Sequence, residues 1–183
     1  LYAQWYGVEH RDPEGFDGAV YGLPERHREA IRKAQLVANP GCYPTATILA
    51  LAPLVEAGLV DGPLVADAKS GVTGAGVKPK ATTHYANVAD NFRAYGVAGH
   101  RHTAEIEEQL ALASRQAGGQ PVHVQFTPHL LPVDRGILST VYARPKADSG
   151  LSAETLEALY REAYADEPFV RLRQQAPSLK DVR

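Results

Sequence analysis

The densest run of apolar residues follows Pro44 and consists of Ile48, Leu49, Leu51, Ala52, Leu54 and Val55. Apolar positions almost all round a helix predict a short buried helix. Residues 37–38 have the pattern of the end of a buried strand, which Pro40 and Gly41 then break. Cys42 is therefore expected in the first turn of the buried helix, where Pro44 loses no hydrogen bond.

The rest of the pattern alternates between strand and helix periods. Strands are predicted at residues 64–70, 122–126 and 137–143, and helices at residues 24–35, 103–117 and 152–165. Thr103 and Ser152 are expected to cap the last two helices. Residues 127–132 contain two prolines that cannot donate to a ladder, so they should not pair throughout. The mixed order of elements predicts an α+β fold, with a mostly antiparallel mixed sheet backed by helices.

Length and composition narrow the class of protein. A chain of 183 residues fits one large domain, and its formal net charge of −2 gives no basis for binding nucleic acid or an anionic membrane. No segment approaches the roughly 18 apolar residues of a membrane span. One cysteine excludes an internal disulfide framework, and there is no signal or transit sequence, so we expect a soluble cytoplasmic protein. The absence of methionine indicates a fragment of a longer protein.

Cys42 is a candidate nucleophile because of its expected place at a helix start. Unpaired N–H groups and the positive end of the helix dipole favour a thiolate over a thiol. A helix terminus stabilises a thiolate by only about 0.3–1 kcal/mol, so a second group must also favour ionisation of the thiol. Histidine is the usual partner of a catalytic cysteine. The alternative is a small buried hydrophobic residue, which is how a free cysteine usually behaves.

A second candidate cluster lies at residues 99–105, with the sequence GHRHTAE. His102 and Glu105 are three residues apart, so the carboxylate could orient the imidazole. One interpretation is general acid–base catalysis by His102, with His100 as the alternative base. The other is a structural histidine that caps the helix. A zinc site would need further ligands at suitable spacing, so we expect no metal.

A glycine-rich segment at residues 70–78, SGVTGAGVK, invites comparison with a phosphate-binding loop. The spacing excludes a nucleotide-triphosphate loop, because Val77 separates Gly76 from Lys78 and a proline follows. A flexible turn and a loop whose backbone approaches an anion both stay open. Arg135, beside a glycine, could hold a carboxylate or phosphate, or form a surface ion pair.

Five segments in order resemble the N-acetyl-gamma-glutamyl-phosphate reductase family. They are residues 20–25 (VYGLPE), 39–45 (NPGCYPT), 70–76 (SGVTGAG), 99–103 (GHRHT) and 132–138 (PVDRGIL). The resemblance implies a place in arginine biosynthesis. It also implies a catalytic domain, for substrate and dimerisation, like that of glyceraldehyde-3-phosphate dehydrogenase over residues 39–183. Residues 1–38 would be a lead-in segment packing on that domain or on a Rossmann domain, absent from this chain, that binds NADPH.

The resemblance further implies a reaction, with Cys42 as the catalytic cysteine and His102 as the base, and residue chemistry supplies the other site candidates. A cysteine thiolate would attack N-acetyl-gamma-glutamyl phosphate, and NADPH would reduce the resulting thioester to N-acetylglutamate semialdehyde. The catalytic candidates are Cys42, His102, Glu105 and His100. Substrate binding is assigned to Asn39, Tyr43, Arg101 and Arg135, with the N–H groups of Cys42 and Tyr43 as an oxyanion site. Cofactor contacts are assigned to Ser70, Gly71, Gly74 and Gly76.

The sequence also departs from the family pattern in places, and it leaves other classes of protein open. The family's Gly-rich dinucleotide loop and its final returning helix are missing here, so little of the NADPH site is expected. A lysine-pathway relative acting on an aminoadipyl phosphate has Asn-Ala where this chain has Tyr43 and Pro44, which favours the arginine enzyme. A cysteine hydrolase or acyltransferase without nicotinamide, and a non-catalytic assembly domain, stay open. We also expect a small-molecule substrate and a homo-oligomer, dimer or tetramer.

Overall fold

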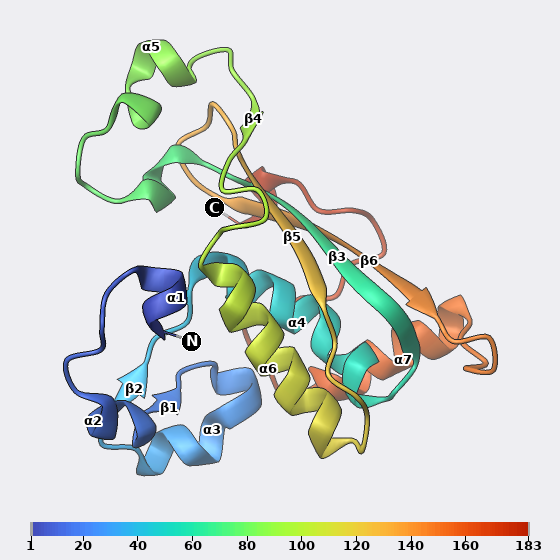
Figure 1. Ribbon diagram of the computed structural model, residues 1–183. Coiled ribbons are helices and arrows are strands. Elements are labelled where there is room, and N and C mark those ends of the chain that lie inside the picture. Colours follow the sequence, from blue (N-terminus) through green and yellow to red (C-terminus); the bar gives the residue numbers. More distant parts are fainter. Residues whose placement is uncertain (1, 183) are drawn as a thin grey trace.

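The computed structural model describes residues 2–182, and its centre is a mixed four-stranded sheet (Figure 1). The strands are β3 (Val60–Ser70), β4 (Arg93–Ala94), β5 (Val124–Leu130) and β6 (Ile137–Pro145), in the order β4-β5-β3-β6. β6 and β4 pair antiparallel with β3 and β5, whereas β3 and β5 pair in parallel. The predicted mixed α+β sheet is confirmed, and its central pairing is the parallel one.

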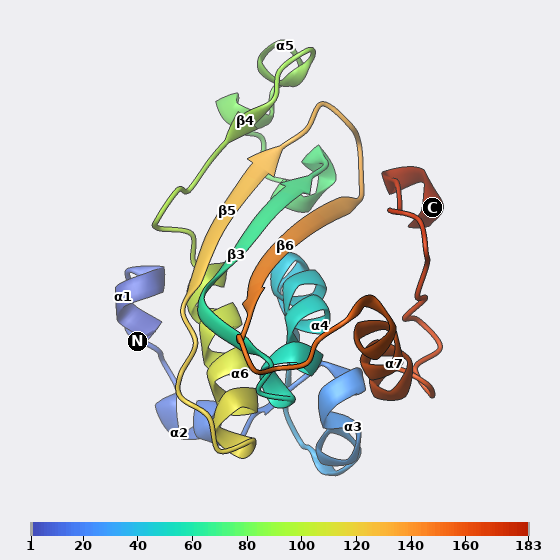
Figure 2. The ribbon, with the colours of Figure 1, turned by 90° about the vertical axis from the view of Figure 1, so that its right-hand side faces the viewer.

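Two helices cover one face of this sheet, α4 (Cys42–Glu56) and α6 (His102–Gln116) (Figures 1 and 2). α6 belongs to the long crossover that a parallel β3–β5 pair requires. Alternate strand residues point at the helices and are almost fully buried: Leu64, Ala66, Ala68, Val124 and Phe126. Nine of the fifteen residues of α4 are buried, which confirms the predicted buried helix.

A third helix, α7 (Ala153–Ala163), packs on α4 through two tyrosines near its end. Tyr164 donates its hydroxyl to Leu49 O at 2.5 Å, and Tyr160 donates to Ala50 O. The predicted cap of α7 is confirmed, because Ser152 Oγ accepts the N–H of Thr155 at 3.2 Å.

The opposite face of the sheet carries no helix within residues 2–182 (Figure 2). Asp67 of β3 lies there between two side chains, 2.6 Å from Lys69 Nζ and 3.1 Å from His129 Nδ1. Tyr142 of β6 is 57% exposed. This face therefore combines polar groups with uncovered aromatic surface.

The N-terminal segment, residues 2–38, contains three short helices and a small parallel sheet. The elements are α1 (Tyr2–Tyr6), α2 (Pro13–Asp17), β1 (Val20–Tyr21), α3 (Pro24–Lys33) and β2 (Val37–Ala38). Leu23 joins the main core at 2% exposure, and Arg28 pairs with Glu167 at 2.5 Å. Val37 is 42% exposed, so the predicted burial of this strand was wrong.

Residues 71–92 leave the sheet and project above it in Figure 1. They hold the short helices η1 (Val72–Ala75), η2 (Ala81–Thr83) and α5 (Tyr85–Val88) before β4 returns to the sheet. A last short helix, η3 (Leu179–Val182), follows an irregular stretch. Among the described residues, no helix is both long and apolar enough to span a bilayer.

Several predicted boundaries were wrong, and for α6 and β5 the local contacts explain the difference. α6 begins at His102 and its N-cap position is Arg101, without a side-chain cap, rather than Thr103. β5 runs through Pro128 because no N–H donor is required at this position. The carbonyl of Pro128 accepts the N–H of Tyr95 at 3.0 Å. α3 ends at Lys33, two residues before its predicted end.

Candidate active site

Cys42 is the first residue of α4, and its side chain is exposed. The carbonyl of Gly41 accepts hydrogen bonds from both N and Oγ1 of Thr45, each at 3.0 Å, which closes the first turn. N–H groups in a first turn have no intrahelical partner, and Pro44 has no N–H to offer. The N–H groups of Cys42 and Tyr43 are therefore the donors available beside the thiol.

The imidazole of His102 lies against the backbone immediately before this cysteine. A Cβ atom at Gly41 would stand 2.6 Å from His102 Nε2 and 3.0 Å from His102 Cδ2. The first distance is shorter than real Cβ contacts and the second is unusually tight, so a side chain at residue 41 would require the His102 ring to move. The packing brings the start of α6 to the start of α4, and Nε2 of His102 to the residue next to Cys42.

His102 is neutral in this environment. Burial, and then the neighbouring Arg101, lower the pKa of His102 to about 4. Its Nδ1 is enclosed and has no hydrogen-bond partner among the described residues. At neutral pH the ring can therefore accept a proton, as a general base must.

His100 has a different setting. Rings surround it, with centroids 4.7–5.9 Å away, from His102, Phe126, Tyr95 and Tyr43. Its Nδ1 accepts the backbone N–H of His102 at 3.2 Å, and burial is the main cause that lowers its pKa to about 4. The structure thus brings together both histidines named from the sequence, and it places His102 against the cysteine's turn.

Glu105 contacts the cysteine's turn instead of the imidazole. Its Oε1 accepts the N–H of Gly41 at 2.8 Å and the hydroxyl of Tyr21 at 2.7 Å. No hydrogen bond joins Glu105 to His102 in residues 2–182, so the predicted orienting contact is not formed. The reason is that two otherwise unpaired donors, partly buried, compete for this carboxylate.

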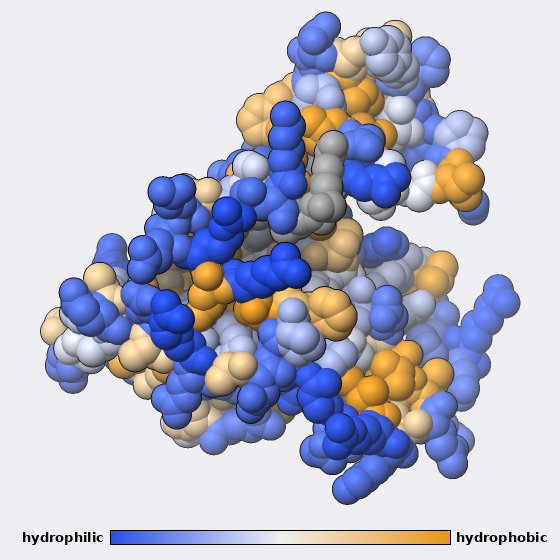
Figure 3. Space-filling view, turned by 180° about the vertical axis from the view of Figure 1, so that it is seen from behind, coloured by the Kyte–Doolittle hydropathy of each residue, from blue (hydrophilic) through white to orange (hydrophobic). Residues whose placement is uncertain are grey.

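A pocket opens in front of the thiol, between the projecting segment and the N-terminal helices. Its walls come from Trp5 of α1, the start of α4, residues 70–83 and residues 93–102. Seen from behind, the molecular outline is notched between these two parts (Figure 3). Cys42, His100 and His102 all line this pocket, so three of the four predicted catalytic residues share one cavity, and Glu105 lies outside its lining.

Three cationic side chains line the same pocket: Lys80, Arg93 and Arg101. The guanidinium of Arg101 stands 5.6 Å from the ring centre of Tyr6, and Arg93 donates to Thr82 O at 2.7 Å. Arg101 was predicted from the sequence as a substrate contact, whereas Lys80 and Arg93 were not predicted. Lys80 follows the glycine-rich segment closely enough to have been a signal, whereas nothing in the local pattern marked Arg93.

Two predicted substrate contacts lie outside the pocket lining. Asn39 is exposed and precedes the cysteine's turn. The Arg135 side chain is 72% exposed and lies 3.6 Å from the Asp134 carboxylate, which matches the surface ion pair left open from the sequence.

Tyr43 is a structural residue more than a surface contact. It is 2% exposed, and its hydroxyl lies 3.2 Å from His129 O and 3.0 Å from the hydroxyl of Tyr95. Tyr95 lines the pocket and was missed by sequence reasoning. Burial raises the pKa of both tyrosines, so both hydroxyls stay protonated and can donate at neutral pH.

The glycine-rich segment forms part of the pocket wall. Ser70, Gly71 and Gly74 line the pocket, whereas Gly76 does not. The N–H groups of Gly71, Val72 and Thr73 are donated to the carbonyls of residues 136, 133 and 134. The small side chains of Ser70, Gly71 and Gly74 leave room for a flat ring against this wall. The three N–H groups that already have carbonyl partners are not free to bind a diphosphate.

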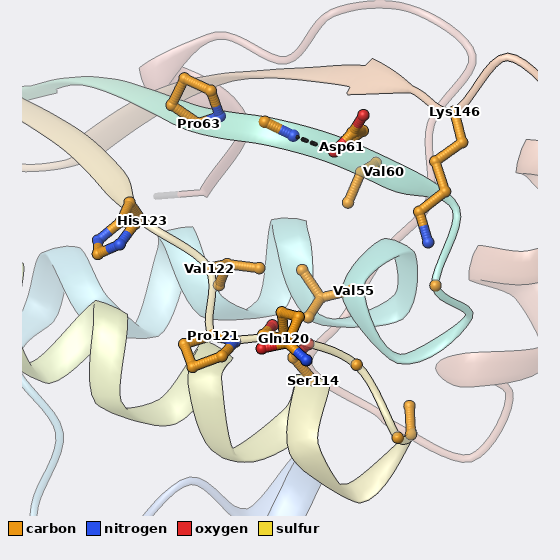
Figure 4. Close-up of a pocket in the computed structure, with 15 residues that line it drawn as sticks. Val55, Val60, Asp61, Pro63, Ser114, Gln120, Pro121, Val122, His123 and Lys146 are labelled. Carbon is orange, nitrogen blue, oxygen red and sulfur yellow. Dashed lines mark hydrogen bonds between the residues drawn. The ribbon is translucent and has the colours of Figure 1, made fainter.

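A second hollow lies at the other end of the sheet, between the ends of α4 and α6 and the start of β3 (Figure 4). Val55, Val60 and Val122 give it an apolar floor, and Lys146 and His123 stand at its margin. None of the site residues named from the sequence lines it. Within the described residues, no cluster of three or more His, Cys, Asp or Glu could hold a metal ion.

Comparison with known proteins agrees with this geometry. Residues 42–183 match the family model described as semialdehyde dehydrogenase, dimerisation domain. The chain is 53% identical over 173 residues to N-acetyl-gamma-glutamyl-phosphate reductase of Halorhodospira halophila, covering 94% of the chain and 48% of the relative. The reductase of Symbiobacterium thermophilum is 51% identical over 185 residues, covering 99% and 51%.

Solved structures show the same fold at low identity. Aspartate semialdehyde dehydrogenase II of Vibrio cholerae matches with a TM-score of 0.55 and 20% identity, over 78% of this chain and 48% of that one. The Candida albicans enzyme, solved with NADP, gives 0.54 and 16%, over 79% and 45%. The chain spans about half the length of the curated relatives it matches. The chain belongs to the semialdehyde dehydrogenase family, and residues 42–183 correspond to its dimerisation domain.

Proposed function

We propose that this chain carries the acyl-transfer half of an enzyme that reduces N-acetyl-gamma-glutamyl phosphate to N-acetylglutamate semialdehyde with NADPH, in arginine biosynthesis. The observation that carries the proposal is the neutral imidazole of His102 against Gly41, beside an exposed cysteine at a helix start. The names of relatives with about 50% identity support the choice of substrate. The compartment we propose is the cytoplasm, where a nucleophilic thiol stays reduced.

The first half of the mechanism is an acyl transfer. The sulfur of Cys42 attacks the acyl carbon, its proton passes to Nε2 of His102, and the carbon–oxygen bond to phosphate breaks, leaving a thioester and inorganic phosphate. The N–H groups of Cys42 and Tyr43 stabilise the negative oxygen that develops on attack. Lys80, Arg93 and Arg101 supply positive charge in the pocket for the substrate's phosphate and carboxylate.

The second half releases the aldehyde. NADPH, when bound, supplies the hydride that reduces the acyl carbon. His102 then gives its proton to the oxygen of the tetrahedral intermediate and takes it back on collapse, while the carbon–sulfur bond breaks and Cys42 leaves as the thiolate. Ser70, Gly71 and Gly74 form the wall against which the reacting ring would lie.

A homo-oligomer is the proposed working form, and a dimer is its smallest version. The matched family model is described as a dimerisation domain, which supports self-association. The sheet face opposite α4 and α6 is the surface available for it, because Tyr142 and Leu138 are exposed there without a covering helix.

The proposal is tested by separating acylation from reduction. The protein that carries this chain, mixed with N-acetyl-gamma-glutamyl phosphate and no NADPH, should release about one phosphate per site and gain the mass of one acyl group at Cys42. Adding NADPH should then give continuous semialdehyde formation. Cys42→Ser should stay folded and lose the acyl adduct and essentially all turnover.

Two outcomes would contradict the proposal. Continuous phosphate release without NADPH would identify a hydrolase, and normal turnover by folded Cys42→Ser would remove the cysteine from the mechanism. His102→Asn should still fold and slow turnover by about 10²–10⁴, the usual contribution of a general acid–base group.

A further inference from the structure

His100 has one ring nitrogen occupied by the backbone of its neighbour. Its Nδ1 accepts the N–H of His102 at 3.2 Å. This N–H belongs to the first residue of α6, where no side chain caps the helix. His100 therefore satisfies a donor that the helix itself leaves unpaired.

That contact fixes the tautomer of the ring. A neutral imidazole carries its single proton on one nitrogen and accepts on the other. Because the pKa of His100 is lowered to about 4, the ring is neutral at pH 7. With Nδ1 as the acceptor, the proton of His100 lies on Nε2.

The Nε2–H group of His100 is not enclosed. His100 lines the cavity together with Cys42 and His102. Its Nε2 makes no hydrogen bond within residues 2–182, and it is not among the enclosed nitrogen and oxygen atoms without a partner. In this it differs from Nδ1 of His102, which is enclosed. The free N–H of His100 is thus accessible to a bound molecule.

The ring has little freedom to turn. Tyr43 and Phe126 stand edge-on to it at 5.9 and 5.4 Å between ring centres, and Tyr95 at 5.6 Å. Gly96 also lies against the ring, because a Cβ there would stand 3.1 Å from His100 Cδ2. A donor held this firmly is preorganised for one acceptor position.

We propose that His100 donates its Nε2–H to an oxygen of the acyl phosphate and takes no part in proton transfer. The two histidines then divide the work: His102 moves the proton and His100 holds the substrate. The proposal rests on the proposed function above. A hydrogen bond to a charged oxygen is worth enough for its loss to lower kcat/KM by about 10–100-fold.

Two substitutions separate the two nitrogens. The amide of Asn reaches the position of Nδ1 and can accept the His102 N–H, whereas the amide of Gln reaches the position of Nε2 and can donate to substrate. In the protein that carries this chain, His100→Asn should keep the wild-type melting temperature and lose about 10–100-fold in kcat/KM. His100→Gln should melt lower and lose about tenfold less activity than His100→Asn.

Two further readouts do not depend on stability. The pH profile of kcat/KM should keep its shape in both His100 variants, because no proton transfer is removed. Long-range proton–nitrogen NMR of the wild type should show His100 with its proton on Nε2 at neutral pH.

Three results would overturn the proposal. The first is an Nδ1–H tautomer or a charged ring at neutral pH. The second is a His100→Gln variant less active than His100→Asn, which would mean that the helix contact alone matters. The third is a changed pH profile in both variants, which would make His100 a base. If the wild type itself fails to reduce the acyl phosphate, the proposed function fails instead, and the NMR result still decides the tautomer.

Discussion

Gly41 is the residue at which the site is assembled. Its N–H binds Glu105, its carbonyl closes the first turn of α4, and its missing side chain makes room for His102. Its φ of −66° is open to any residue, so space and not conformation is what requires glycine here.

Gly41→Ala should therefore damage the chemistry more than the fold. The added Cβ would stand 2.6 Å from His102 Nε2 and 3.0 Å from Glu105 Oε2, so the ring must shift from its position beside the cysteine's turn. A displacement of about 1 Å at a reacting group can cost about 10²-fold in rate, and we expect kcat to fall by that order. Steady-state kinetics and thermal denaturation of the same preparation would measure both effects.

Gly99→Ala is the matched control for this substitution. Gly99 lines the same pocket, and the nearest atom to an added Cβ there is 4.0 Å away. Its activity should stay well above that of Gly41→Ala. Equal losses in the two variants would mean that the pocket tolerates no alanine, and that the contact with His102 is not the cause.

The two lowered histidine pKa values predict how stability depends on pH. His100 and His102 have folded pKa values near 4, against about 6.5 in an unfolded chain, so the unfolded state binds more protons between these values. Their contribution is fully present above pH 6.5 and is lost as the pH falls toward 4. Urea midpoints at pH 7 and pH 5 should differ more for the wild type than for the double variant His100→Asn, His102→Asn. Equal differences would contradict the assigned burial.

Several candidate residues of the site could be named from residue type and position in the sequence. A lone cysteine between a helix-breaking Pro-Gly and an apolar helix was enough to name Cys42, and His-x-His at a helix start was enough to name His100 and His102. The choice between the histidines could not follow from spacing. It depends on which ring packs against Gly41, a contact between segments about 60 residues apart in the chain.

At the scale of elements, Glu105 joins three of them. It lies in the first turn of α6 and accepts from the start of α4 through Gly41 and from β1 through Tyr21. The Glu105 carboxylate thus adds hydrogen bonds to the apolar packing of α4 on α6, at the end of the two helices where Cys42 lies.

Glu105→Ala should loosen this junction, because it leaves two partly buried donors without an acceptor. We expect a loss of about 1–3 kcal/mol in the free energy of unfolding, measured in denaturant. Glu105→Gln keeps an oxygen at the same place and should lose clearly less. If both variants are equally unstable, the charge of Glu105 matters more than its hydrogen bonds.

Elements with a strong local pattern were predictable and their pairing was not. α4 follows from its apolar run, α6 from helical periodicity, and α7 from periodicity together with the Ser152 cap, within a few residues at each end. The parallel β3–β5 pair depends on a crossover of more than 50 residues, which no local pattern encodes. Pro128 inside β5 shows the same limit. A proline fits a strand where the neighbouring strand does not require an N–H donor from it, and Tyr95 contacts only the carbonyl of Pro128.

At the scale of the whole molecule, the sheet has two unlike faces. One is sealed by α4 and α6, and the other exposes Tyr142 at 57% and Leu138 at 37% around the ion pair of Asp67 and Lys69. Exposed aromatic surface on a sheet, rimmed by polar groups, is typical of an interface. In a two-fold contact the same patch meets itself, so one substitution acts twice.

Tyr142→Glu should therefore dissociate the oligomer of the protein that carries this chain. The new carboxylates would be buried near each other across a two-fold axis, and an unpaired buried charge is strongly unfavourable. Phe169→Glu is the control, because Phe169 is 90% exposed and lies beyond α7 in the chain, outside every strand of the sheet. Light scattering after size exclusion should give a smaller mass for Tyr142→Glu alone, with its melting curve still cooperative. An unchanged mass for Tyr142→Glu, or dissociation by Phe169→Glu instead, would place the interface elsewhere on the molecule.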